Sequence, residues 1–594
     1  MTNNKIKQKK WDLSDIIKSP EGEPLKELLT SLENSIKEIE AIRPKLNNKC
    51  NAQTFNFALE HLQNLSIAAN RLGSYAGLWF SENTQNQSAL SFQAKIEQII
   101  TEANNRALFL MLWWKHLPDK HASLLIHDAP ETLQYYLEYQ RKESPHVLEE
   151  QNEQIVNIKN INGTNALTTI YAMITNKYTF DLSIGQTKKT KLTRDALMNY
   201  VRDPNAKARK MAYQELYRVY ENDGIVLSQI YKNLVQDWYE EYVKLRKHPT
   251  PISVRNLSND IPNEVTKTLL SVCRENTHIF QRWFKIKARI LSLKQLNRYD
   301  IYAPINSSIT KYPYAESVEL VLNTFEEFSP KIAAAARQIF KENHIDSENR
   351  NGKRGGAFCA SIIPSITPYV LINYGGSIRD VATLAHELGH AVHSMISNNH
   401  SVLTYHSTLP LAETASTFSE MLLIDKLLES TTDNNVKQDI IANSLDDNYA
   451  TIMRQAYFTI FEQKAHEMIE NHSDTDDLNE AYLKNLEEQF GDSVKVNSEF
   501  KWEWISIPHI YYTPFYCYSY SFGQLLVLAL YQRYKEIGSK FIPQYIQILE
   551  YGSSKSPQYI LEKAGIDISS PKFWQGGFNF INKLIDEVEN TTQD

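Results

Sequence analysis

Apolar residues recur along most of the chain at the three- and four-residue spacing of amphipathic helices. A regular example follows Pro24, a residue that suits the first turn of a helix. Its apolar positions are Leu25, Leu28, Leu29, Leu32, Ile36 and Ile39. Residues 55–80 continue it, whereas polar segments at 343–356, 430–435 and 471–477 predict loops. Only 19 glycines occur in 594 residues, too few for a turn-rich β architecture. The pattern therefore predicts a mainly α fold.

One stretch has a strong strand pattern. Residues 368–373 are apolar and rich in β-branched side chains, and a Gly-Gly pair ends the run. Residues 357–364 form a second, weaker strand or turn segment. A helix is expected next, because Ser377 is a suitable N-cap and Asp380 stands three residues further on, as in a capping box. The pattern predicts strand character directly before this helix.

Composition narrows the class of protein. With 42% hydrophobic residues the chain can build more than one core, and its net charge of −7 argues against a nucleic-acid partner. The four cysteines are scattered without a C-x-x-C pair, so neither a disulfide framework nor a thiolate zinc site is expected. The first ten residues do not resemble a secretory signal, and the apolar stretches are too short to span a bilayer. We expect a cytoplasmic protein with no membrane partner.

Residues 386–390 read His-Glu-Leu-Gly-His. Residues four apart share one face of a helix, so His386 and His390 can present two imidazoles to one metal ion. Zinc lowers the pKa of a bound water, and Glu387 can accept the water proton and pass it to a leaving amine. The helix is apolar on most sides, and buried histidines beside a buried glutamate are costly without a partner such as a metal. We predict one zinc ion per chain.

A catalytic zinc needs a third protein ligand. The extended pattern H-E-x-x-H-x-x-G-x-x-H fails, because His393 stands where that pattern requires glycine. Glu413 is the preferred candidate, since it is a lone carboxylate in the apolar opening of a predicted helix. Glu420, seven residues later on the same face, is an alternative ligand or a group that orients one. His393 and His406 are the remaining alternatives.

Residues 509–523 combine one histidine with an unusual density of tyrosines. Aromatic core packing explains part of this density. Donors are also needed for the oxyanion that forms when water attacks a peptide carbonyl, and His509, Tyr511 and Tyr518 are the candidates. The spacing of the two tyrosines predicts that they share one helical face. The other tyrosines are left unassigned: Tyr512, Tyr516 and Tyr520.

The predicted strand at residues 369–373 offers a place for a substrate backbone. An exposed edge strand can pair with an extended peptide through main-chain hydrogen bonds. Gly355 and Gly356, which precede it, allow close backbone approach. The strand would hold the scissile bond over the metal with little side-chain preference; a purely structural sheet is the alternative.

Three motifs, in order along the chain, carry a family resemblance: residues 355–393, 411–420 and 509–525. Together they resemble the M3 family of metallopeptidases, most closely its oligoendopeptidase F branch. Residues 9–16 and 143–153 are similar to that branch too, so the resemblance covers nearly the whole chain. It implies a mostly helical fold of two lobes around a deep channel, with a small β-sheet beside the zinc.

The resemblance also implies roles for parts of the chain. Residues 1–190 would form an N-terminal helical lobe and residues 191–594 the catalytic region. The implied zinc ligands are His386, His390 and Glu413. Glu387 would be the general base, and His509 and Tyr518 would stabilise the transition state.

The implied activity is endopeptidase cleavage of short unfolded peptides, the only substrates that a narrow channel admits. Two alternatives remain. One is a carboxypeptidase or dipeptidase of the same fold, which would need a fixed charge to hold a peptide terminus. The other is a non-catalytic peptide-binding protein with a structural zinc, although structural zinc sites usually have four protein ligands and no adjacent base.

Overall fold

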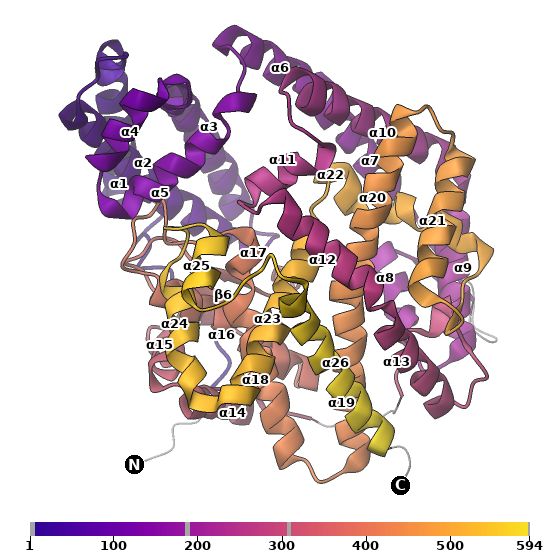
Figure 1. The fold of residues 1–594 in the computed structure, drawn as a ribbon. Helices are drawn as coiled ribbons and strands as arrows, with labels where there is room; N and C mark the ends of the chain where they lie inside the picture. The colour runs from indigo at the N-terminus through magenta and orange to yellow at the C-terminus, as the bar shows by residue number, and fades with distance from the viewer. Residues whose placement is uncertain (1–5, 184–189, 306–310, 592–594) are drawn as a thin grey trace, which may run out of the picture. The chain divides into compact units, whose positions relative to one another are not determined.

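The computed structural model describes residues 6–183, 190–305 and 311–591, and the chain divides into two units (Figure 1). Unit 1 comprises Met1–Ser144, Ile309–Glu429 and Arg533–Ile566, and unit 2 comprises Pro145–Ser308, Ser430–Gln532 and Asp567–Asp594. Helices dominate both units, which confirms the mainly α class. The division into residues 1–190 and 191–594 stays a prediction.

Unit 1 holds the first five helices, a second helical group and one three-stranded sheet. Its helices are α1 Glu23–Ile42, α2 Ala52–Glu82, α3 Gln87–His116, α4 Asp119–His127, α5 Glu131–Lys142, α14 Tyr314–Phe328, α15 Pro330–Lys341, α16 Ile378–Ile396, α17 Leu409–Ala412, α18 Thr414–Ser430, α24 Ile542–Glu550 and α25 Pro557–Lys563. Its strands are β4 Ile345–Asp346, β5 Phe358–Ala360 and β6 Tyr369–Leu371.

Unit 2 is helical with two short strand pairs. Its helices are α6 Glu150–Asn162, α7 Thr164–Asn176, α8 Arg194–Met198, α9 Ala206–Asn222, α10 Gly224–Trp238, α11 Pro251–Ser258, α12 Asn263–Glu275, α13 Thr277–Ile290, α19 Asn434–Asn448, α20 Arg454–Glu470, α21 Thr475–Phe490, α22 Pro508–Tyr512, α23 Tyr518–Ile537, whose last turns belong to unit 1, and α26 Pro571–Thr591. The strands β1 Phe180–Leu182 and β2 Thr190–Leu192 pair antiparallel, and β3 Leu296–Asn297 pairs in parallel with β7 Val494–Lys495.

The amphipathic pattern near the N-terminus forms the helices that it predicts. α1 begins one residue before Pro24, and its buried positions include Leu32, Ile36 and Ile39. The predicted helix at 55–80 lies within α2, which packs against α1 and α3 (Figure 1). Burial of the apolar stripes between these three helices is the main source of their stability, since isolated helices are marginal in water.

The sheet of unit 1 corrects one prediction. β6 is the strand predicted at 368–373, and all three of its residues are buried. It lies in the centre of the sheet, parallel to β4 on one side and antiparallel to β5 on the other. The prediction that β6 is an exposed edge is therefore wrong, because β4 and β5 occupy the hydrogen-bonding groups on both of its sides. The two edges are β4 and β5, and β5 is the strand that the sequence predicts as the weaker segment at 357–364.

Helix α16 packs on this sheet and begins where the sequence predicts. Ser377 Oγ accepts a hydrogen bond from the backbone N–H of Asp380 at 3.2 Å, and the Asp380 carboxylate accepts one from the N–H of Ser377 at 2.9 Å. This capping box satisfies donors that the first turn of a helix leaves unpaired. α16 contacts β5 and β6 on one side and α14 and α15 on another. The cap and these contacts fix the helix that carries the His-Glu-Leu-Gly-His sequence.

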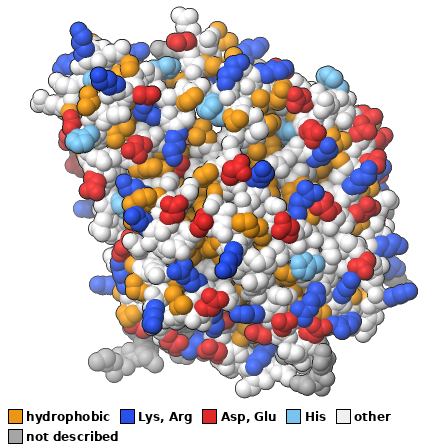
Figure 2. Space-filling model, in the orientation of Figure 1, with side chains coloured by type: hydrophobic (Ala, Val, Ile, Leu, Met, Phe, Trp, Pro, Cys, Tyr) orange, Lys and Arg blue, Asp and Glu red, His pale blue; other side chains and the backbone are white. Residues whose placement is uncertain are grey.

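Charged side chains of both signs are interspersed on the face that Figure 2 shows, and hydrophobic side chains lie scattered between them. Within the described residues, no helix combines the length and the apolar character that crossing a membrane requires.

Candidate metal centre

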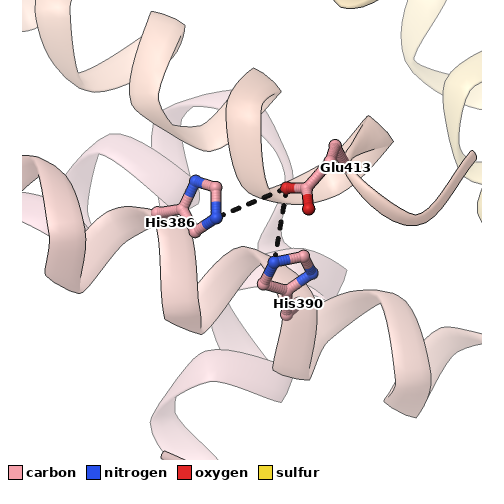
Figure 3. Close-up of side chains that lie close together, drawn as sticks. All are labelled: His386, His390 and Glu413. Carbon is pink, nitrogen blue, oxygen red and sulfur yellow. Dashed lines mark ion pairs between the residues drawn. The ribbon is translucent and has the colours of Figure 1, made fainter. Parts of the chain in front are cut away.

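Two histidines and one glutamate meet on unit 1. His386 and His390 stand one turn apart on α16, and their ring centroids are 4.8 Å apart. Glu413 lies at the junction between α17 and α18. Its Oε2 is 3.4 Å from His386 Nε2 and 3.4 Å from His390 Nε2 (Figure 3). The structure therefore brings together the three side chains predicted as zinc ligands.

The spacing of these atoms fits a tetrahedral metal. Two ligand atoms that are each about 2.0–2.1 Å from a zinc ion, at tetrahedral angles, lie about 3.3–3.4 Å apart. The two measured nitrogen–oxygen distances are 3.4 Å, and all three ligand atoms lie within 4.8 Å of one another. Two imidazoles and one carboxylate are also the donor set of several catalytic zinc sites. Three protein ligands leave a fourth position for water or substrate.

Glu420 orients the first histidine. This residue of α18 pairs with Nδ1 of His386, on the opposite side of the ring from Glu413. A carboxylate on Nδ1 fixes the tautomer in which Nε2 carries the lone pair, the arrangement usual for a ligating histidine. Of the two roles that the sequence allows for Glu420, the geometry favours the orienting one.

Acidic groups dominate the electrostatics of the centre. Burial lowers the pKa of His386, but Glu420, followed by Glu413 and Glu387, more than offsets this effect and raises the pKa to about 9. The same negative charge that favours a proton on this ring favours a metal cation in its place. Burial lowers the pKa of His390, which favours the neutral ring that a metal needs.

Glu413 is held by its own helix. Ser416 Oγ donates a hydrogen bond of 2.7 Å to Glu413 Oε2. The backbone carbonyl of Glu413 accepts the N–H of Thr417 at 3.1 Å, so the residue stands at the N-terminal end of α18. These contacts restrict the carboxylate to the side that faces α16.

Gly389 brings α16 and α18 into close contact. A Cβ atom at this position would lie 2.6 Å from the carbonyl oxygen of Ala415 and 2.6 Å from Cα of Ser416. Both distances are far inside van der Waals contact, and both partners are backbone atoms. Glycine is therefore required in the middle of α16 so that the helix carrying Glu413 can approach the histidines.

Glu387, the predicted proton acceptor, lines the same cavity as His386 and His390. Its side chain is 6% exposed. Burial raises the pKa of its carboxyl to about 7, with Glu413 and Glu420 adding to the effect and His386 opposing it. A carboxyl whose pKa lies near neutrality can both accept and release a proton at working pH.

His393 and His406 lie outside this group of three. Both line a cavity of about 550 Å³ that also borders His386, His390 and Glu387. Burial lowers the pKa of His393 to about 3. Among the described residues at this site, the ligand atoms that lie within 4.8 Å of one another are those of His386, His390 and Glu413. Neither of the two alternative histidines belongs to this group.

Residues 199–580 match the family model for Peptidase family M3. The chain belongs to this family. M3 enzymes are metallopeptidases, so the protein is a hydrolase that acts on peptides. The family resemblance proposed from the three sequence motifs is confirmed.

Curated relatives place this M3 peptidase near the oligoendopeptidase F group. It is 28% identical over 595 residues to an oligoendopeptidase F homolog of Borreliella burgdorferi, covering 98% of both chains. It is 25% identical to oligopeptidase PepF of Bacillus subtilis, covering 98% of this chain and 86% of the relative. It is 30% identical over 413 residues to the chromosomal oligoendopeptidase F of Lactococcus lactis subsp. cremoris, covering 68% of this chain and 67% of the relative.

Solved structures share the fold of this M3 peptidase. A peptidase from Chlamydophila abortus aligns with a TM-score of 0.85 at 24% identity, covering 98% of both chains. Oligoendopeptidase-F from Enterococcus faecium aligns with a TM-score of 0.72 at 22% identity, covering 96% of this chain and 98% of the other. At these identities the likeness establishes the fold.

The tyrosine segment of the M3 peptidase lies in unit 2 and is not one helix. α22 ends at Tyr512 and α23 begins at Tyr518, and Phe515 between them has a φ of +57°. The prediction that Tyr511 and Tyr518 share one helical face is therefore wrong. A left-handed residue interrupts the helix, and the spacing alone does not reveal it.

The two predicted tyrosines are core residues of unit 2. Tyr511 is 2% exposed, stacks on Tyr171 and donates its hydroxyl to the carbonyl of Leu227 at 3.3 Å. Tyr518 is fully buried, and its hydroxyl accepts a hydrogen bond of 2.8 Å from Asn259 Nδ2. These contacts give both rings a structural task; their catalytic role stays a prediction.

His509 has different tyrosine neighbours. Tyr520 lies with its hydroxyl 3.4 Å from His509 Nε2, and the Tyr516 ring is parallel to the imidazole at 6.1 Å between centroids. Burial lowers the pKa of His509, and the charge of Arg454 lowers it further. His509, Tyr516 and Tyr520 are therefore the members of the segment that form a group of partly exposed polar side chains.

The turn between α22 and α23 is anchored by a buried acid. Glu462 on α20 accepts the N–H of Phe515 at 2.8 Å. Burial raises the pKa of Glu462 to about 8, with the Phe515 hydrogen bond opposing the effect. Neither Glu462 nor Gly389 is apparent from the sequence, because each acts through a contact distant along the chain. A glycine at the fourth position of the motif is the one signal for the close approach of helices.

Proposed function

We propose that this M3 peptidase is a zinc-dependent oligoendopeptidase that cleaves internal bonds of short unfolded peptides. The observation that carries the proposal is the convergence of two histidines on one carboxylate: His386 Nε2 and His390 Nε2 each lie 3.4 Å from Glu413 Oε2. Glu387 lines the cavity beside the two histidines. When bound there, zinc would supply Lewis acidity that lowers the pKa of water and polarises a peptide carbonyl.

Glu387 performs the proton transfers in this proposal. Its carboxylate takes a proton from the attacking water and delivers it to the nitrogen of the departing amine. Burial, which raises the pKa of this carboxyl to about 7, makes both halves of the transfer accessible near neutral pH. Glu420 keeps the His386 ring in its ligating orientation throughout, and Ser416 does the same for Glu413.

The edge strand β5 is the proposed site for the substrate backbone. β5 pairs with β6 along one side, and Phe358–Ala360 line the cavity that borders the metal ligands. An extended peptide can add to such an edge through main-chain hydrogen bonds, which do not depend on side-chain identity. β5 thereby takes the role predicted above for residues 369–373.

The resemblance assigns transition-state stabilisation to His509 and Tyr518, and we retain that assignment as a proposal. A neutral imidazole can donate one hydrogen bond to a developing oxyanion. The lowered pKa of His509 supports the neutral form.

The test is digestion of a mixed-length peptide library, with products identified by mass spectrometry. Internal cuts in the zinc-loaded protein support the endopeptidase, whereas stepwise trimming from one terminus would show the carboxypeptidase or dipeptidase alternative. Glu387→Gln removes the proton acceptor but none of the three ligands, so it should retain zinc and lose at least about a thousandfold in turnover. Glu429→Gln, an exposed position on α18, is the matched control.

Two outcomes would refute this assignment. Near-normal turnover by Glu387→Gln would show that Glu387 is not the general base. Zinc retained by Glu413→Ala after dialysis would show that another residue is the third ligand. Stoichiometric zinc without hydrolysis of any peptide would favour the non-catalytic binding protein.

A further inference from the structure

The cavity beside the metal centre extends well beyond the three ligands. Its volume is about 550 Å³, and all of its lining residues belong to unit 1. One wall is β5 with the residues beside it, a second is α16, and the third is the segment that leads into α17. A space of this size is typical of a site that receives part of a ligand.

The cavity begins at the ligands and runs along α16 toward its C-terminal end. His386 and His390 border it at one end, and His393, Ser394 and Ser397 follow on the next turns of the same helix. Residues three and four apart project from one face of a helix, so these side chains form a continuous wall. A peptide bond held at the metal centre would have a flanking side chain beside this wall.

The lining is rich in hydrogen-bonding groups. Ser361, next to β5, and Ser394 share a hydroxyl hydrogen bond of 2.6 Å across the cavity walls. His406 lines the cavity as an exposed side chain. Tyr405, also in the lining, is 2% exposed, and its hydroxyl has no hydrogen-bond partner among the described residues. A buried hydroxyl without a partner is unfavourable, and a ligand group can satisfy it.

Formal charge is scarce in the same lining. Among the described residues that form it, Glu387 is the single acid, and no lysine or arginine is present. An anionic side chain would therefore lose its water without gaining a counter-ion, which is costly. A cationic side chain would meet only Glu387, the residue that the proposed function assigns to proton transfer. A neutral amide or hydroxyl would instead find donors and acceptors in the serines, the imidazoles and the tyrosine.

We propose that this cavity is the subsite for a side chain that flanks the scissile bond, and that Tyr405, His406 and Ser394 make it prefer neutral hydrogen-bonding side chains over charged or purely apolar ones. The inference rests on the proposed peptidase function and adds a substrate class to it: peptides with Gln, Asn, Ser or Thr beside the cleaved bond. The broad main-chain recognition by β5 would then operate together with one selective position.

The test uses the zinc-loaded protein and one internally cleaved parent peptide taken from the library digest. Each of the two residues that flank the scissile bond is replaced in turn by Gln, Leu, Glu or Lys, and kcat/KM is measured for each peptide. At one of the two positions we expect Gln to exceed Glu and Lys by at least about tenfold, because a charged side chain would lose its hydration in a lining with little compensating charge. Equal kcat/KM for Gln, Glu and Lys at both positions would overturn the proposal.

Variants connect the preference to the lining. Tyr405→Phe removes one hydroxyl and keeps the ring, so the ratio of kcat/KM for Gln over Leu should fall about threefold to tenfold, the effect of one hydrogen bond. His406→Leu replaces a polar group of the lining by an apolar one, and the ratio should fall in the same direction. Tyr559→Phe, a partly exposed tyrosine on α25, is the matched control and should leave the ratio as in the parent protein.

The outcomes separate this inference from the proposed function. A fall of the ratio in Tyr405→Phe or His406→Leu supports the subsite, and an unchanged ratio in both variants overturns it. In that second case peptides are still cleaved, so the peptidase assignment stands. Failure of the parent protein to cleave any peptide would overturn both.

Discussion

Gly389→Ala is the substitution that most sharply tests how the fold builds the metal centre. The added Cβ would lie 2.6 Å from the Ala415 carbonyl oxygen and 2.6 Å from Ser416 Cα, whereas ordinary contact begins near 3.4 Å. Helix α18 must therefore move away from α16 by about 0.8 Å, the difference between the 2.6 Å contact and the ordinary contact distance of 3.4 Å. Metal–ligand distances tolerate only about 0.2 Å. We expect Glu413 to lose its place among the ligands.

The assay is competition for zinc with a chelator of known affinity, combined with thermal unfolding of the metal-free protein. Zinc affinity should fall by at least about tenfold to a hundredfold, the usual effect of displacing groups that support a metal site. The metal-free protein should lose about 1–3 kcal/mol of stability, the range for overpacking a core.

Gly77→Ala provides the control for this experiment. Gly77 lies within α2, and a Cβ there would meet no atom within 4 Å. Alanine should stabilise this helix by about 0.5–1 kcal/mol and leave zinc affinity unchanged. If Gly389→Ala binds zinc as tightly as the parent protein, close packing of α16 on α18 is not what positions Glu413.

Three further predictions address single side chains. Glu420→Ala should weaken zinc binding about tenfold to a hundredfold by freeing the His386 ring. Glu420→Gln should have an affinity between those of the parent protein and Glu420→Ala, because its amide oxygen still accepts from Nδ1. Equal zinc affinities of all three proteins in chelator competition would contradict the orienting role. The pKa of Glu462 rises from near 4.5 to about 8 on folding, so the folded state keeps a proton that the unfolded chain loses, and stability falls as pH rises between these values. Denaturant unfolding should show that the free energy of unfolding of Glu462→Gln, relative to the parent protein, increases by a few kcal/mol from pH 5 to pH 8. The glutamine amide oxygen still accepts the Phe515 N–H, so this hydrogen bond is kept. A difference in stability that does not change with pH would show that the acid stays ionised. His509→Ala should lower kcat by about a hundredfold with little change in KM if this imidazole acts on the transition state; an increase in KM alone would assign it to substrate binding.

Local patterns predicted the helical part of the fold well. The stripe after Pro24 and the Ser377–Asp380 cap are signals contained in a few consecutive residues, and both correspond to helices at the expected places. The position of β6 in its sheet was not predictable in the same way. Strand pairing depends on partners far along the chain, and a short apolar run reads alike at an edge and in a centre.

The metal centre likewise has a part that local sequence predicts and a part that depends on distant segments. Residues 386–390 specify a helical face with two imidazoles, and this part follows from the sequence. The choice of Glu413 among carboxylates and histidines stays a prediction, which the 3.4 Å separations support. The close approach at Gly389 and the burial of the Tyr405 hydroxyl do not follow from the sequence, because each depends on what another segment places opposite it. In unit 2, the left-handed Phe515 breaks a helix that spacing alone had favoured.

Diffraction from crystals of the zinc-loaded protein, recorded on both sides of the zinc absorption edge, tests the central claim most directly. We predict one anomalous peak per chain, about 2.0–2.2 Å from His386 Nε2, His390 Nε2 and a Glu413 oxygen, with no fourth protein ligand. A peak bound by other side chains, or one with four protein ligands, would contradict the account.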